Sequence, residues 1–130
     1  MEETEPTIEQ FVAKLRAELP DIQPDTEDDW DWTWADEGMD LIESGELLLA
    51  ERKFQELILA RPGHFEGYEG LALVYHDMQR KREAVMLIGH AVLLAQEFLR
   101  KDFIDREVFD VVADEQHDIL GMPDMPTHED

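Results

Sequence analysis

The sequence contains no cysteine, and few of its residues carry a positive charge. Without cysteine the chain forms no disulfide and offers no thiolate for zinc binding or nucleophilic catalysis. Its 11 basic residues stand against 33 acidic ones, which gives a formal net charge of -22 at pH 7. A field of that sign repels phosphate backbones and anionic lipids, so we expect no nucleic-acid partner and no membrane partner.

Long hydrophobic runs and catalytic motifs are also missing. No apolar stretch approaches the length that spans a bilayer. The opening Met-Glu-Glu-Thr-Glu-Pro lacks both the basic and the apolar region of a signal peptide. We therefore expect a cytoplasmic protein. The 5 histidines show no metal-ligand spacing, and there is no glycine-rich phosphate loop or nucleophile elbow. The sequence therefore predicts no metal, no cofactor and no enzymatic activity.

What the sequence does contain is an internal repeat with a period of thirty-four residues. Five large or small residues of the first unit recur in the second: Trp34 as Tyr68, Gly38 as Ala72, Leu41 as Tyr75, Ala50 as Ala84 and Phe54 as Ile88. A fixed period of this size indicates stacked supersecondary units, each of which cannot bury its apolar face alone.

The spacing resembles the tetratricopeptide repeat, a pair of antiparallel helices. The first unit, residues 31–64, has the family's residues at five positions: Trp34, Gly38, Ala50, Phe54 and Pro62. The second unit, residues 65–98, has them at Leu71, Tyr75 and Ala84, whereas Gln96 stands where the closing Pro is usual. Glu37 and Leu41 also depart from the pattern. The resemblance implies an all-α fold, a solenoid of antiparallel helix pairs.

The repeat register predicts four helices, over residues 32–44, 46–60, 65–77 and 81–98. Outside the repeat, Thr7-Ile8-Glu9-Gln10 has the form of a capping box and is followed by an apolar stripe, which predicts a helix over residues 7–19. The stripe is too apolar to leave in water, so we expect it to dock on the rest of the chain or on a second copy.

A final helix is predicted over residues 102–120. Only one of its residues fits the repeat signature, so we interpret it as a cap that covers the open end of the solenoid and not as a third repeat. The chain then divides into an N-terminal amphipathic helix with an acidic linker (1–29), a two-repeat domain with its capping helix (30–121) and a flexible tail (122–130).

In the tetratricopeptide family the first helix of each repeat lines a concave groove that meets the partner. Carried over position by position, the resemblance implies a groove lined by Trp32, Asp36, Met39, Glu43, Glu66, Glu69, Leu73, His76 and Asp77, with Ala35 and Gly70 among them. Such a groove is acidic with an apolar strip, which suits a basic or amphipathic protein segment. The alternative is a groove that is too short, or that a terminal segment covers.

We therefore expect a non-enzymatic protein–protein interaction module, an adaptor or a co-chaperone-like protein. A second hypothesis is a self-associating structural subunit, a homodimer through the N-terminal helix or an open repeat end, whose acidity serves only solubility or adaptation to salt. The resemblance also admits a third, a small acidic secretion-type chaperone that holds a partner segment unfolded.

Overall fold

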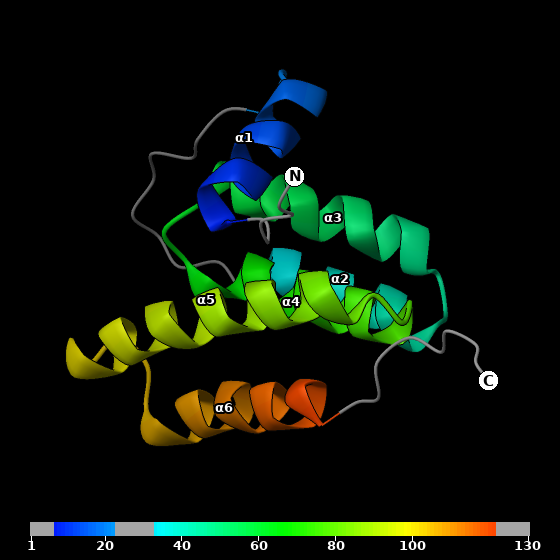
Figure 1. Cartoon of the computed structure of the whole chain (residues 1–130). Coiled ribbons are helices and arrows are strands. Elements are labelled where there is room, and N and C mark those ends of the chain that lie inside the picture. The colour runs from blue at the N-terminus through cyan, green and yellow to red at the C-terminus, as the bar shows by residue number, and fades with distance from the viewer. Residues whose placement is uncertain (1–6, 23–32, 122–130) are drawn as a thin grey trace, which may run out of the picture.

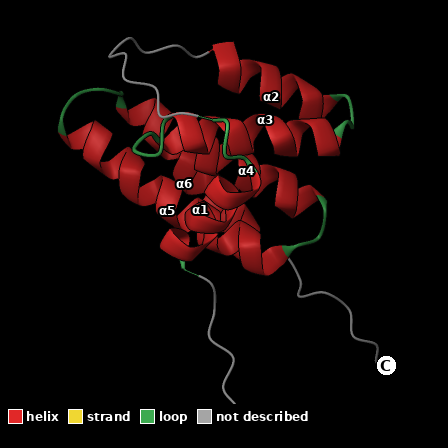
Figure 2. Ribbon diagram, turned by 90° about the horizontal axis from the view of Figure 1, so that it is seen from above, coloured by secondary structure: helices red, strands yellow, loops and turns green. Residues whose placement is uncertain are grey.

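The computed structural model describes residues 7–22 and 33–121, and in these two ranges all regular structure is α-helical (Figures 1 and 2). The helices are α1 (Ile8–Glu18), α2 (Thr33–Glu43), α3 (Leu47–Ala60), α4 (Phe65–Asp77), α5 (Lys81–Arg100) and α6 (Arg106–Leu120). From α2 onward each helix packs against the next one in sequence. Short connections between neighbouring helices give antiparallel pairs, and the predicted all-α helix-pair solenoid is confirmed.

The thirty-four-residue period is present in the backbone itself. At the end of α2 the N–H of Glu46 donates to the carbonyl of Leu41 (2.9 Å), and at the end of α4 the N–H of Arg80 donates to the carbonyl of Tyr75 (2.8 Å). In both turns the residue before the donor has a left-handed backbone, with φ angles of 82° at Gly45 and 64° at Gln79. Only the first of these two residues is a glycine. This is the Schellman form of helix termination, used twice in equivalent places.

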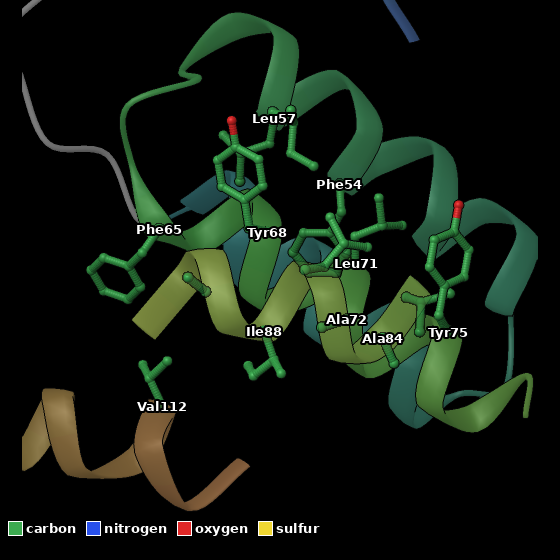
Figure 3. Packing of buried hydrophobic residues seen from close by; sticks show 14 of the residues in the cluster. Phe54, Leu57, Phe65, Tyr68, Leu71, Ala72, Tyr75, Ala84, Ile88 and Val112 are labelled. Carbon is green, nitrogen blue, oxygen red and sulfur yellow. The ribbon is translucent and has the colours of Figure 1, made fainter. Parts of the chain in front are cut away.

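The core lies between the helix pairs, where the repeated positions meet. Phe54, Tyr68, Ala72 and Ile88 are buried (Figure 3), as are Ala50 and Ala84. Figure 3 also shows Ile88 of α5 pointing toward Val112 of α6, so the core continues into the last helix. Trp34 differs from its equivalent Tyr68, because it is only partly buried against this core.

The N-terminal helix docks in cis, which confirms one of the two expected outcomes for its apolar stripe. Thr7 and Gln10 form the predicted capping box, with the backbone N–H of Gln10 on Thr7 Oγ1 (3.1 Å) and the N–H of Thr7 on Gln10 Oε1 (3.2 Å). Leu15 is buried, and its neighbours on the stripe pack beside it: Ile8, Phe11, Val12 and Leu19. In Figure 1 α1 lies over α3, and it contacts α5 as well.

The last helix begins later than predicted. α5 continues to Arg100 and is closed by a third left-handed turn, in which Asp102 has a φ of 62° and the N–H of Phe103 donates to the carbonyl of Phe98 (2.8 Å). Helix α6 then starts after Asp105, whose Oδ1 accepts from the N–H of Val108 (3.1 Å). The prediction of a helix from residue 102 was wrong because a left-handed residue cannot continue a helix.

Candidate functional site

A hollow of about 250 Å³ opens on the side of the molecule formed by α2, α4 and α6. Its lining comes from these three helices and from one residue of α3 behind them: Ala35, Asp36, Met39, Phe54, Phe65, Glu66, Glu69, Gly70, Val108, Val111 and Val112. The first helix of each repeat therefore contributes one wall, and α6 contributes the third.

Two glycines bring the walls together around one aromatic ring. A Cβ atom on Gly70 of α4 would lie 2.1 Å from the ring of Phe54, and one on Gly38 of α2 would lie 2.4 Å from it. The ring lies close to both helices and is buried, with 1% of the residue's surface exposed. The sequence places glycine at both positions because only a bare Cα lets α2 and α4 approach the ring this closely.

The hollow collects four of the nine groove residues that the resemblance implied. Asp36 and Met39 stand exposed on α2, and Met39 retains 36% of its surface. Glu66 and Glu69 come from α4, where Glu66 is only 7% exposed. Ala35 and Gly70, expected among them, also line the hollow.

The remaining implied residues lie elsewhere. Glu43 is exposed at the end of α2, and Leu73 packs partly buried against the core. His76 and Asp77 stand at the end of α4, where His76 Nδ1 lies 3.8 Å from Asp77 Oδ1. None of these four lines the hollow. Trp32 lies outside the described residues.

The residues of α6 are the part of the site that the sequence interpretation missed. Val108, Val111 and Val112 complete the lining, and Val111 remains 53% exposed. Because α6 fits the repeat signature at a single residue, it was expected to act only as a cap. The spacing Val108, Val111, Val112, Glu115 could have revealed a single helix face, since these positions lie one above another on a helix.

The charges in the hollow are acidic and partly shielded from water. Burial raises the pKa of the Glu69 carboxyl well above its usual range, and a hydrogen bond to the Glu115 side chain raises it further. Burial also raises the pKa of Glu115, with added repulsion from Asp118 and Asp114. Burial is the largest cause of both shifts, because a charged carboxylate loses its solvation when it is removed from water. Near Glu66, His64 Nδ1 lies 4.0 Å from Glu66 Oε1.

Other perturbed groups in the fold have structural roles. The Tyr68 hydroxyl donates to the carbonyl of Pro62 (2.8 Å), and burial raises the pKa of Tyr68 to about 12. Its ring meets His90 edge-on at 4.6 Å between centroids, and burial lowers the pKa of His90. These contacts tie α4 to α5 and to the preceding turn, and none of the three residues lines the hollow.

A second, more polar hollow of about 420 Å³ lies under α1. At its base the Tyr75 hydroxyl donates to Glu51 Oε2 (2.8 Å), and the Arg80 guanidinium lies 4.2 Å above the Tyr75 ring. Arg80 also pairs with Glu83 (3.0 Å). These contacts join α3 to the α4–α5 turn, and α1 contributes part of the lining of this hollow.

The described residues show neither a metal site nor a membrane span. Across residues 7–22 and 33–121, no three His, Asp or Glu side chains are grouped so that they could hold a metal ion. Over the same stretches no helix combines the length and the apolar character that crossing a bilayer requires. The chain matches no protein-family model, and searches of the curated proteins and of the solved structures found no match.

Proposed function

We propose that this protein is a non-enzymatic interaction module that holds a basic, amphipathic segment of a partner protein in the hollow between α2, α4 and α6. The observation that carries the proposal is the combination of acidic and apolar side chains in that one place. Asp36, Glu66 and Glu69 line it together with the exposed side chains of Met39 and Val111. Opposite charge speeds the encounter, and buried apolar contacts supply most of the affinity.

The scaffold is proposed to be of the tetratricopeptide type. Support comes from the Schellman turns at Gly45 and Gln79 and from the equivalent hydrogen bonds around them. Further support comes from α6, which packs on α5 and α4 in the way that α4 packs on α3 and α2. In this arrangement α6 takes the place of a third groove-lining helix, which makes the groove longer than two repeats alone would provide.

The test uses a synthetic amphipathic helical peptide of lysine and leucine, titrated into the whole protein by calorimetry. We expect binding, and we expect a peptide of the same pattern with glutamate in place of lysine not to bind. Asp36→Lys, on the wall of the hollow, should weaken the lysine peptide. Glu18→Lys, a matched charge reversal on α1, should leave it unchanged. Equal binding of both peptides, or equal effects of both variants, would show that the acidity serves only solubility.

Self-association remains the second candidate function, and one observation favours it. Leu48 and Leu49, in the first turn of α3, are 75% and 56% exposed. The apolar stripe of α1, by contrast, already packs against the chain's own core. A dimer would therefore use the open end at α2 and α3, and sedimentation equilibrium with Leu48→Glu would detect it as a change in mass.

A further inference from the structure

The hollow between α2, α4 and α6 has acidic side chains on two of its walls. Asp36 comes from α2, whereas Glu66 and Glu69 come from α4, where their spacing puts them on one face of the helix. Among the described residues that line the hollow, none is basic. His64 Nδ1 lies 4.0 Å from Glu66 Oε1, but His64 is not part of the lining. A ligand that enters the hollow therefore meets three acidic side chains and no basic one.

The rest of the lining is apolar. Met39 on α2 and Val111 on α6 keep 36% and 53% of their surfaces exposed, whereas Phe54 and Val112 in the same lining are buried. A side chain that matches both parts of this lining has an apolar stem and a cationic end. Arginine and lysine have this form, since their methylene stems pack on apolar surface while the charged group lies at the tip.

The volume of the hollow limits what can enter it. Its volume of about 250 Å³ is that of about eight water molecules, at about 30 Å³ each. Pockets that hold whole small-molecule ligands are larger, on the order of 300–1,000 Å³. One long side chain therefore fits, and the backbone of a bound segment stays outside.

The burial of Glu66 distinguishes between the two cationic side chains. Its side chain is 9% exposed, so a cation that pairs with it gives up most of its hydration. A guanidinium group is more weakly hydrated than an ammonium group, and its planar set of donors serves two carboxylates at once. Burial is the largest cause of the raised pKa of Glu69, and repulsion from Glu66 adds to it. A guanidinium between the two carboxyl groups offsets this repulsion.

Resting on the proposed function, we propose that the hollow is an anchor pocket for one arginine side chain of the bound segment. The methylene groups of this arginine pack against Met39 and Val111, and its guanidinium group donates to the carboxylates of Glu66 and Glu69. The remaining apolar residues of the segment make their contacts outside the pocket. The pocket then selects a segment by a single residue and not by its overall charge.

The experiment compares three amphipathic helical peptides of leucine and glutamine by calorimetry on the whole protein. They differ only at the centre of the polar face, where they carry arginine, lysine or citrulline, which has the shape of arginine without its charge. The arginine peptide should bind about tenfold more tightly than the citrulline peptide, because hydrogen bonds between charged groups are lost in the latter. The lysine peptide should lie between the two.

Variants of the protein locate the anchor. Glu66→Gln and Glu69→Gln should each weaken the arginine peptide about tenfold and leave the citrulline peptide nearly unchanged. Glu43→Gln, at the exposed end of α2 and outside the lining, is the matched control and should change none of the three affinities. The methyl carbon NMR signal of Met39 should shift when the arginine peptide binds. Circular dichroism verifies that each variant is folded.

The outcomes separate this proposal from the proposed function. Equal affinity for the arginine peptide and either of the other two overturns the arginine anchor, as do equal losses in Glu43→Gln and the two variants of the hollow. If none of the three peptides binds while the lysine–leucine peptide does, the anchor is again overturned and the proposed function stands. If the lysine–leucine peptide does not bind either, both are overturned.

Discussion

Gly45 and Gln79 occupy equivalent places in two successive turns, and both adopt left-handed backbone conformations, with φ angles of 82° and 64°. Each lets the following N–H reach the carbonyl five residues earlier, at Leu41 and at Tyr75. Glycine adopts this conformation without steric cost, whereas a residue with a Cβ atom is strained there. The second turn is therefore held by its hydrogen bonds against the preference of its own residue.

Replacing Gln79 with glycine should stabilise the protein. Removal of the Cβ atom relieves the left-handed strain, and we expect the free energy of unfolding to rise by about 1 kcal/mol. Urea denaturation monitored by circular dichroism measures the change. Gln79→Ala keeps the Cβ atom and serves as the control, so it should bring no such gain. Gly45→Ala should lower stability by a similar amount, because it introduces the same strain into the first turn.

Adding one methyl group at Gly70 should destabilise the protein. The new Cβ atom would lie 2.1 Å from the buried ring of Phe54, so the ring or the helices around it must shift, at a cost of about 1–3 kcal/mol. At Gly89 in α5 a Cβ atom meets nothing closer than 3.9 Å. Gly89→Ala should therefore raise stability by up to about 1 kcal/mol through helix propensity alone. A gain at both positions would contradict the close approach of α4 to Phe54.

The free energy of unfolding should fall as pH rises through the titration of Glu69. Burial and Glu115 raise the pKa of Glu69 in the folded protein, so between its usual value and the raised value the native state holds more protons than the unfolded state. This contribution is complete below about pH 4, where the unfolded glutamate is also protonated, and it is lost above the folded value.

Glu69→Gln should remove this dependence on pH. The variant should be more stable than wild type at neutral pH, and the difference should disappear near about pH 4. Denaturation curves at several pH values measure it, with Glu107→Gln on the exposed side of α6 as the control. A control variant with the same flattened profile would mean that the slope belongs to the overall negative charge.

Binding at the hollow should separate into an electrostatic and an apolar component. Asp36→Lys should slow association of the lysine–leucine peptide, and the loss should shrink as salt rises, because exposed charges are screened over about 8 Å at physiological ionic strength. Met39→Ala should chiefly speed dissociation, by up to about tenfold, since it removes apolar contact area. Stopped-flow kinetics at low and high salt distinguishes the two. Effects of both variants on the same rate constant would contradict this assignment.

The sequence predicted most of the helical framework because one of its signals, a proline, is local and the other is the repeat register. Pro62 ends α3 near the predicted residue, and the register carried the α2–α3 turn forward to α4 and α5 although glycine is absent from the second turn. The sequence did not predict the start of α6, because an aspartate such as Asp102 does not by itself indicate a left-handed conformation. Asp105 is a suitable N-cap, but aspartates are so common in this acidic chain that it does not stand out.

The candidate site was predictable only where the repeat applied. Asp36, Met39, Glu66 and Glu69 come from helices in register, so one template placed them together. Glu115 and the valines of α6 belong to a helix outside the register, and the sequence gives no direct indication of its contact with α4. The meeting of Glu69 with Glu115 is a tertiary contact between helices far apart in the chain, which periodicity alone does not reveal.

Helix α1 packs on both α3 and α5, one helix from each of the two successive pairs. In a linear array each pair touches only its neighbours, so the terminal pair can fray while the rest stays folded. Because α1 contacts both pairs, it raises the free energy of that partial opening: Leu15 loses its burial when either pair separates. We expect the intact chain to melt in a single cooperative transition, and Leu15→Asp to split hydrogen exchange into an early-opening α2–α3 unit and a slower remainder.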